Sequence, residues 1–516
     1  MYNTRRLAPT FLIPFKAFSI EVRLLLKNKR FRMIGVEDFK TLSLRPGESR
    51  SEFVPRISHL TSSAATNGHE SAIITAACLE ENHIKNHCFF NDRGFHNHIV
   101  HHLLALYSLG SPPQVIMEAF ENEKTEQRPI VKVDDHEFDS EKWAEYVGQE
   151  KYYGNYLEFF KSEINKKGSV TVVEEYIFRP SKAELFNRSF SGILHPLIHW
   201  GYGLEFNLDA IVAEGLAIAA VHDLSMTGLE LKKLLKEESS ETNFNGLISR
   251  SKKKVNDYSW PDFAIRVQSK VYHPKLGLSS FEIIFQIMQE DELAPKQKIA
   301  MPDMEHFEKI SQSPQLAHWI NQWKIEPCAS VDEIFQKTQE LLWLVTVLYA
   351  ASFDERRGVY VLDFAVMHLV TSALFLPTII SAINPSLHPA LLTAFFKVSV
   401  TVWVAMGRPR LQLSEILRDP ANVELPRDQN PNKGENPWFK VLSSAARHPD
   451  EHTTKIVRTL EFSSRVYGST PKGFYKSNLR GTEQLDSSIF LRAAIMTLNK
   501  QDWAVKSNFR QFKWFM

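Results

Sequence analysis

The chain has little cysteine and almost no net charge, and both features narrow its class. Only three of its 516 residues are cysteines, and Cys78, Cys88 and Cys328 form neither a CxxC motif nor an even set of partners. This excludes a zinc ribbon and a disulfide-stapled secreted scaffold, and it predicts a reducing compartment. A formal net charge of +1 offers no electrostatic basis for binding nucleic acid, so no nucleic-acid partner is expected.

Several familiar cofactor and hydrolase motifs are missing as well. The sequence contains no P-loop, no HExxH and no GxSxG. Gly201-Tyr202-Gly203 lacks the third glycine and the preceding strand of a GxGxxG turn, so we expect no flavin and no Rossmann-type nicotinamide site. His195 and His199 have the spacing of HExxH histidines, but the glutamate that acts as the base of a zinc peptidase is absent.

What the chain does have is apolar residues at helical spacing. Hydrophobic residues make up 43% of the sequence, which is enough to bury a large core. They recur every three or four residues between Gly and Pro, which predicts a mainly α fold in a single large helical domain. VTVVEEYIF at 170–178 is the best strand signal. Helices are expected at 92–109, 113–122, 139–165, 196–221, 226–237, 329–352, 359–383, 389–406, 450–466 and 486–499.

The longest apolar stretch, 364–407, exceeds the ~20 residues that span a bilayer. Asn384-Pro385-Ser386 and His388-Pro389 divide it, and His368 and Lys397 would lie in mid-span, where polar groups are costly. The sequence therefore predicts two buried core helices and no integral membrane span.

Lys397 is the only formally charged residue between Phe364 and Gly407. A lone ammonium is costly to desolvate, so a buried lysine loses its proton, finds an anionic partner or is chemically modified. This isolation makes Lys397 a candidate site residue. The alternative is that its long stem carries the ammonium to the surface.

Histidines cluster in three segments. FHNHIVHHLL places His98 and His102 one turn apart on one helix face. In HPLIHWGYGLEF, the following proline disfavours helix at His195, so this imidazole lies at a helix start. HPDEHTTKIVRTLEF puts His452 in a first helical turn, where the helix dipole keeps the imidazole in the neutral, metal-binding form. Each histidine alone is better explained as a hydrogen-bonded core residue, but together with His368 they predict a shared, buried, histidine-lined cavity.

The first 36 residues are basic, with eight lysines and arginines against one acid, Glu21. They resemble a mitochondrial presequence, and a non-native extension from a misplaced start codon would look the same. Residues 38–70 are rich in Ser, Arg and Pro, which favours a linker. We expect a poorly packed extension and linker at 1–70 and a helical domain at 71–516. The expected location is cytoplasmic, or mitochondrial if the presequence is genuine.

Six segments, in order, carry a family resemblance: FHNHIVHHLLALYSLG, YYGNYLEFF, HPLIHWGYGLEF, EGLAIAAVHD, LDFAVMHLVTSALFLP and HPDEHTTKIVRTLEF. Together they resemble the questin oxidase-like family, fungal oxygenases of anthraquinone-derived polyketide pathways, over roughly 75–510. The resemblance implies an oxidoreductase that uses O2 to cleave or oxygenate a polycyclic aromatic small molecule. It implies either a Baeyer–Villiger-type insertion with NADPH or an iron-dependent dioxygenation.

Some members of that family are described with a non-heme iron held by four histidines and a carboxylated lysine. The corresponding metal ligands here would be His98, His195, His368, His452 and Lys397, with Fe(II) as the metal and O2 as the co-substrate. A deprotonated lysine adds CO2 to give a carbamate, and this anion would take the place of a carboxylate ligand.

The predicted catalytic residues are His98, His195 and Lys397. His102, His199 and His222 are second choices or partners that orient the ligands.

Three hypotheses remain open at this stage. In the first, iron leaves a position for O2 or for the phenolate of a quinone that stacks on Trp200-Gly201-Tyr202. In the second, an enzyme without metal uses histidines as bases, so that a substrate carbanion reacts with O2 directly. In the third, the protein is a catalytically silent helical scaffold. Metal analysis separates the first from the others, and O2 uptake with an anthraquinone separates the second from the third.

Overall fold

The computed structural model describes residues 69–133, 138–140, 142–182, 184–238, 272–294, 304–419 and 435–501. Contacts divide the chain into two compact units, Met1–Ser51 and Glu52–Met516, and every described residue belongs to the second. The basic extension and nearly all of the predicted linker lie outside the described residues, so the boundary expected near residue 70 stays a prediction.

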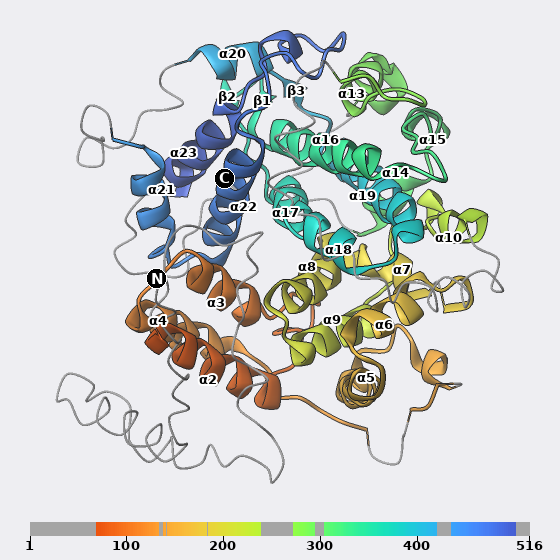
Figure 1. Cartoon of the computed structure of the whole chain (residues 1–516), viewed down its shortest axis with the longest axis vertical. Coiled ribbons are helices and arrows are strands. Elements are labelled where there is room, and N and C mark those ends of the chain that lie inside the picture. Colours follow the sequence, from red (N-terminus) through yellow and green to blue (C-terminus); the bar gives the residue numbers. More distant parts are fainter. Residues whose placement is uncertain are drawn as a thin grey trace, which may run out of the picture. The chain divides into compact units, whose positions relative to one another are not determined.

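Helices dominate the described residues, which confirms the predicted mainly α fold (Figure 1). The N-terminal half contains α2 (His69–Lys85), α3 (Ile99–Ser108), α4 (Pro113–Glu123), α5 (Tyr153–Lys167), α6 (Ser169–Val173), α7 (Glu184–Ser189), α8 (Ser191–Phe206), α9 (Asp209–Val221) and α10 (Lys232–Glu238). Short 3-10 turns lie between them at Lys124–Glu126, Trp143–Tyr146, Glu150–Tyr152, Pro180–Lys182 and Thr227–Leu229.

The C-terminal half is also helical. It contains α13 (Ser280–Gln289), α14 (Met304–Ser311), α15 (Pro314–Ile320), α16 (Val331–Ala350), α17 (Phe364–Ala373), α18 (Leu376–Ala382), α19 (His388–Ala405), α20 (Leu413–Arg418), α21 (Trp438–Ala445), α22 (Glu451–Tyr467) and α23 (Ser488–Gln501). Its 3-10 turns are Asp291–Leu293, Pro385–Leu387 and Thr482–Gln484. One small antiparallel sheet, in the order β2-β1-β3, joins β1 (Ser352–Asp354), β2 (Val359–Tyr360) and β3 (Arg410–Leu411).

Two predicted helices are each interrupted. The segment 196–221 forms α8 and α9, because Asn207 adopts a left-handed conformation with φ of 54° and ends α8. The two helices then pack closely. A Cβ at Gly203 would lie 2.5 Å from the backbone nitrogen of Val212, and one at Gly215 would lie 2.4 Å from that of Trp200. The segment 359–383 begins as β2 and divides into α17 and α18.

The predicted strand at 170–178 is wrong. This segment forms α6 followed by a π-helical turn at Glu174–Phe178. Its apolar residues Val172, Val173, Tyr176 and Ile177 are all buried, and their spacing of one and four residues suits a helical face. Burial against neighbouring helices therefore overrides the strand preference of the β-branched residues.

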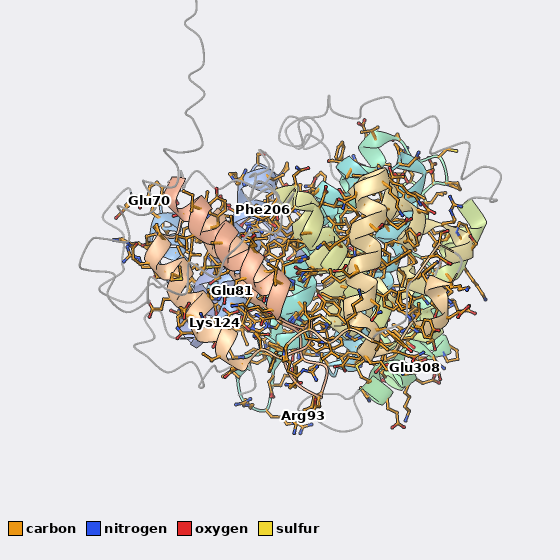
Figure 2. All side chains as sticks on the ribbon, turned by 90° about the horizontal axis from the view of Figure 1, so that it is seen from below. Glu70, Glu81, Arg93, Lys124, Phe206 and Glu308 are labelled. Carbon is orange, nitrogen blue, oxygen red and sulfur yellow. The ribbon has the colours of Figure 1, made fainter. Side chains whose placement is uncertain are left out.

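Two described segments are long and apolar enough to cross a membrane, Phe364–Ala382 and Pro385–Ala405, and 89% of each apolar window is buried inside the protein. Core helices of a globular domain are buried to this extent, which fits the prediction that the chain has no integral membrane span. Charged side chains such as Glu70 and Arg93 lie at the periphery in Figure 2, while side chains fill the space between the helices.

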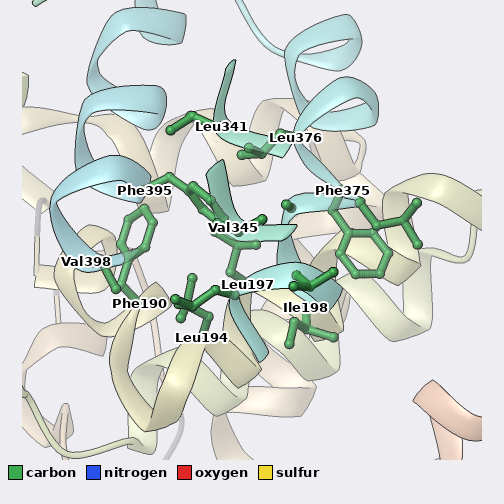
Figure 3. Close-up of a cluster of buried hydrophobic side chains, with 14 of the residues drawn as sticks. Phe190, Leu194, Leu197, Ile198, Leu341, Val345, Phe375, Leu376, Phe395 and Val398 are labelled. Carbon is green, nitrogen blue, oxygen red and sulfur yellow. The ribbon is translucent and has the colours of Figure 1, made fainter. Parts of the chain in front are cut away.

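Helices α3, α8, α17 and α22 form the frame of the functional site. Helix α3 packs on α8 and α22, and α17 also packs on both of these helices, so the four enclose a common centre (Figure 1). Behind α8, the apolar side chains of Leu194, Leu197 and Ile198 pack with Leu341 and Val345 of α16 (Figure 3). This apolar packing fixes α8 on the side away from the centre.

Candidate metal centre

Each of these four helices brings one of the predicted histidines to the centre. His98 is the residue that precedes the first turn of α3, and His452 lies in the first turn of α22. His368 lies in the middle of α17, and His195 lies where α8 becomes regular. The residues before His195 are left-handed, with φ of 54° at Gly192, 54° at Ile193 and 62° at Leu194, so the regular helix begins at His195, as its proline neighbour predicts.

The four imidazoles lie in contact with one another. The ring centres of His98 and His195 are 5.0 Å apart, and those of His98 and His452 are 4.8 Å apart. His368 lies 4.7 Å from His195 and 5.2 Å from His452 by the same measure. Ligand nitrogens of His98, His368 and His452 all lie within 4.8 Å of one another. The predicted convergence of the four histidines is therefore confirmed.

Two of the rings have a proton position fixed by a backbone carbonyl. Nδ1 of His195 lies 2.5 Å from the carbonyl oxygen of Gly192, and Nδ1 of His368 lies 2.8 Å from that of Phe364. A carbonyl oxygen can only accept, so each Nδ1 donates its proton outward. In a neutral imidazole the other nitrogen then carries a lone pair, so Nε2 of each ring is left as a donor to a metal ion.

A single carboxylate lies beside the outer nitrogens of the other two rings. Oε1 of Glu451 lies 3.2 Å from Nδ1 of His98 and 3.1 Å from Nδ1 of His452. Asp450 caps α22 by accepting from the backbone N–H of His452, and its carboxylate lies 3.3 Å from Nδ1 of that ring. Carboxylates and carbonyls that hold the outer nitrogen of histidines are the usual support of a metal site.

The inner nitrogens of the rings lie close together. Nε2 of His98 and Nε2 of His195 form a hydrogen bond of 2.8 Å. Because His195 donates from Nδ1 to the carbonyl of Gly192, its Nε2 carries a lone pair, and Nε2–H of His98 can donate to it. This separation is near the spacing of about 3 Å that two nitrogens have when both bind the same metal ion through bonds of ~2.1 Å. Nε2 of His368, which is fully buried, has no hydrogen-bond partner among the described residues.

Electrostatics keep these rings neutral. Burial lowers the pKa of His98, His195 and His368 well below the usual value, and the charge of Lys455 adds to this effect. His96 braces the group from outside, because its ring stacks parallel on His195 with 4.0 Å between centres. Neutral imidazoles are the form that binds transition metals.

Lys455, rather than Lys397, is the lysine of this centre. Lys455 lies one turn after His452 on α22, is 2% exposed, and its Nζ has no hydrogen-bond partner among the described residues. Burial lowers its pKa to about 8, against the opposing charges of Glu451, Asp450 and Glu123. Lys397 is only half-buried on α19, and Lys455 is the lysine whose charge acts on the centre's histidines. The prediction that Lys397 completes the ligand set stays a prediction, and its isolation in sequence did not amount to full burial.

The second-choice histidines take other partners. Nδ1 of His102 pairs with Glu123, and although burial acts to lower the pKa of His102, this carboxylate raises it. His199 bonds to Glu214 rather than joining the centre. His222 follows α9, and its ring stacks 5.1 Å from that of His96. None of the three replaces a member of the group of four.

Sequence reasoning missed Lys455, Glu451 and Glu214. The segment HPDEHTTK contains a signal for the first two. Helical spacing places Lys455, three residues after His452, on the same face of the helix, and Glu451 is a first-turn carboxylate next to that histidine. Glu214 lies 15 residues from His199 in the sequence, and its pairing depends on how α9 packs against α8.

Fold and site together define a helical protein built around a buried, histidine-rich centre suited to a transition metal. The model of the questin oxidase-like family matches residues 95–460, which is more than half of the chain and includes all four histidines and Lys455. The chain therefore belongs to the questin oxidase-like family, and it is an oxidoreductase.

The sequence is similar to those of several curated relatives over most of their length. A Baeyer-Villiger oxidase of Pestalotiopsis microspora is 28% identical over 422 residues, which cover 77% of this chain and 82% of that protein. The questin oxidase of Aspergillus terreus is 27% identical, with 77% of this chain and 81% of its own length covered. The oxidoreductase AflY of Aspergillus parasiticus is 26% identical, with 75% and 71% covered.

Proposed function

We propose that this oxidoreductase uses O2 to cleave or oxygenate a polycyclic, anthraquinone-like aromatic compound of fungal secondary metabolism, at a non-heme iron. The ligands would be His98, His195, His368, His452 and a carboxylated lysine at position 455. The observation that carries the proposal is the convergence of His98, His368 and His452, whose ligand nitrogens lie within 4.8 Å of one another, beside a buried Nε2 of His368 that has no hydrogen-bond partner among the described residues. Iron bound there would supply the activation of O2.

The protein's own groups would hold and orient that ion. Glu451 fixes two rings at once through their outer nitrogens, and the carbonyls of Gly192 and Phe364 fix the other two. The Nδ1 atoms of His195 and His368 donate to carbonyls, and those of His98 and His452 lie beside the Glu451 carboxylate, so the Nε2 atoms would be left to the metal. Burial of the group excludes bulk water, which limits side reactions of a reactive oxygen species.

Lys455 would supply the anionic ligand. Its neutral amine attacks the carbon of CO2, an N–C bond forms, and the amine releases a proton, so that a carbamate with one negative charge replaces a cation. A pKa of about 8 gives Lys455 a sizeable neutral fraction near neutral pH. The carbamate would also remove the cost of a buried ammonium next to neutral histidines.

The substrate class follows from the relatives. One is named for questin and others for Baeyer-Villiger oxidation, and all act as oxidases by name. We infer a polycyclic aromatic small molecule as the substrate of this chain, with Tyr202, which stacks on His101 at 5.3 Å, on the aromatic side of the centre. A flavin is not expected.

A metal-free, NADPH-dependent Baeyer-Villiger oxidase is the second candidate. Several relatives are named Baeyer-Villiger oxidases, which favours this candidate. Buried neutral imidazoles can also act as bases toward a phenol. The family match speaks against the third hypothesis, a silent scaffold.

Metal analysis and O2 uptake test the proposal together. The full chain is loaded with Fe(II) and bicarbonate without oxygen, its iron is counted, and O2 uptake is followed with a hydroxyanthraquinone, with and without NADPH. Lys455→Met removes the carbamate, and Lys397→Met is its matched control on another core helix. We expect about one iron per chain, and loss of both iron and O2 uptake in the Lys455 variant only. O2 uptake that needs NADPH and survives metal removal would instead favour the second candidate.

A further inference from the structure

A second set of buried polar residues runs from α2 to the edge of the histidine centre. Nδ1 of His83 lies 2.6 Å from Oε1 of Glu214, and Nε2 of His199 lies 2.7 Å from Oε2 of the same carboxylate. Nδ1 of His199 lies 3.1 Å from Nε2 of His101. All four side chains are buried, with exposures of 7% or less, so no bulk water competes for these hydrogen bonds.

The carboxylate sets the direction of this chain of hydrogen bonds. Burial acts to raise the pKa of Glu214, but hydrogen bonds from His199 and His83 hold it at about 2, so Glu214 is ionised and can only accept. His199 therefore donates from Nε2. Nδ1 of His199 and Nε2 of His101 share one proton across 3.1 Å, and with that proton on Nε2 of His101 the His199 ring accepts through Nδ1.

His101 is then left with a lone pair at Nδ1. In this tautomer the single proton of the His101 ring is the one shared with His199. Nδ1 of His101 is buried and has no hydrogen-bond partner among the described residues. The ring lies 5.7 Å from His98 and 6.2 Å from His195 between centres, and it stacks on Tyr202. An unused acceptor thus lies beside the centre and next to an aromatic face.

We propose that Glu214 is a positioning residue, which through His199 fixes His101 in the Nε2–H tautomer, and that Nδ1 of His101 accepts a hydrogen bond from a hydroxyl group of the aromatic substrate. This rests on the proposed function only in taking the substrate to be a hydroxylated aromatic compound. A ring ether at the same position offers no hydrogen and would leave the buried acceptor unpaired, so the chain selects free phenols over their methyl ethers.

The tautomer is read directly in the wild-type full chain. Histidine labelled with 15N is observed by long-range proton–nitrogen correlation, and His101 is assigned from the signal lost in His101→Asn. We expect the proton on Nε2 and a free Nδ1. A proton on Nδ1 of His101 overturns the proposal. This measurement needs neither iron nor turnover.

Ligand preference tests the link to Glu214. Binding of a dihydroxyanthraquinone and of its dimethyl ether is measured by fluorescence quenching in wild type and in Glu214→Gln. A carboxamide can accept from one imidazole only and must donate to the other, which releases the tautomer of His101. We expect the preference for the free phenol to fall about tenfold, the scale of one lost hydrogen bond. An unchanged preference in a folded Glu214→Gln protein overturns the proposal.

Glu123→Gln is the matched control. Glu123 is also a largely buried carboxylate, 10% exposed, and is bonded to an imidazole, that of His102, but among the described residues no hydrogen bond joins it to His101. The control should keep both the His101 tautomer and the phenol preference. Since these assays use binding and proton position, absence of iron or of O2 uptake would sink the proposed function and leave this inference standing.

Discussion

Two buried polar clusters in this protein have opposite characters. In one, Glu340 of α16 is fully buried and accepts from the hydroxyl of Tyr272 at 2.7 Å, the indole of Trp323 at 3.1 Å and the backbone N–H of Ser280 at 2.5 Å. Lys337, one turn earlier on the helix, lies 3.4 Å from the same carboxylate and 4.4 Å from the Trp323 ring. The other cluster is the histidine centre, where the nitrogens of buried imidazoles converge.

The difference shows how a polar cluster that only stabilises the fold, here called a brace, can be distinguished from a binding site. The Glu340 carboxylate is surrounded by donors from three segments, so its burial is compensated within the protein and it ties α13 to α16. Nζ of Lys337 also lacks a hydrogen-bond partner, but it forms an ion pair with this carboxylate at 3.4 Å. At the histidine centre Nε2 of His368 and Nζ of Lys455 have neither a hydrogen bond nor an ion pair among the described residues. Unsatisfied groups at full burial are costly, and they indicate a bound species.

The largest effect is expected from removing a histidine of the centre. His368→Ala deletes one inner nitrogen and should reduce iron content and O2 uptake by at least about a hundredfold, since an inner ligand matters more than its supporting partner. Iron analysis and oxygen-electrode rates check this. The exposed His318, on α15, is the control, and His318→Ala should change neither. A His368→Ala protein that keeps its iron would remove the distinction between the clusters.

A change in the brace around Glu340 should affect the stability of the fold instead of iron binding. Glu340→Ala leaves Lys337 as a buried, uncompensated charge and should lower the free energy of unfolding by about 3–5 kcal/mol. Urea titration measures this loss, and the iron affinity of the folded fraction should stay at the wild-type value. A loss below about 1 kcal/mol would mean that the cluster is not a brace.

Support of the centre should have an intermediate effect. Glu451→Gln weakens the hold on two rings and should cost about 10- to 100-fold in iron affinity, measured by competition with a chelator. Glu355→Gln, which removes only an exposed pair with Arg410, serves as the control. Equal affinities for both variants would show that Glu451 does not orient the ligands.

A pH profile sharpens the role of Lys455. Its pKa of about 8 in the fold lies below the ordinary 10.5, so the unfolded chain holds this proton more firmly and the metal-free protein gains stability as pH rises between these values. Carbamate formation needs the neutral amine. Iron loading at fixed bicarbonate should therefore rise about tenfold from pH 7 to pH 9. Lys455→Met should give a flat profile, and a flat wild-type profile would contradict the carbamate.

The smallest effect is expected at Lys397. Since this side chain is half-buried, Lys397→Met should change stability by only about 0.5 kcal/mol and leave iron content unchanged. Lys397→Arg should behave in the same way. Loss of iron in either variant would indicate that Lys397, and not Lys455, is the lysine ligand.

Helical periodicity made most of the fold predictable, and it failed where local conformation depends on neighbours. The break at Asn207 needs one left-handed residue that the apolar pattern does not mark, and the segment 170–178 is helical because its apolar residues face other helices. The short strands pair residues up to 59 positions apart, such as Ser352 with Leu411, and local patterns do not reveal such pairs.

The candidate site was predictable as far as its histidines. Their segments could be matched one by one to a family pattern, and each proved to lie at or near the start of its helix or on an inward face. Lys397 attracts notice because it stands alone among apolar residues, whereas Lys455 follows two threonines and several charges and looks ordinary in the sequence, although it is the more deeply buried of the two. Which lysine is buried depends on tertiary packing.

The left-handed turn in the first residues of α8 also sets the order of events during folding. Ile193 and Leu194 adopt a conformation that costs about 1–2 kcal/mol per residue, and only burial of Leu194 in the core can offset this. An isolated segment would avoid the turn, so we expect His195 to reach its orientation after α9 and α16 have packed. Pulsed hydrogen exchange during refolding should show protection of the α9 amides before that of residues 192–195, and the reverse order would contradict this. Iron would then bind a chain that has already folded, and metal supply would govern activation of the protein rather than its folding yield.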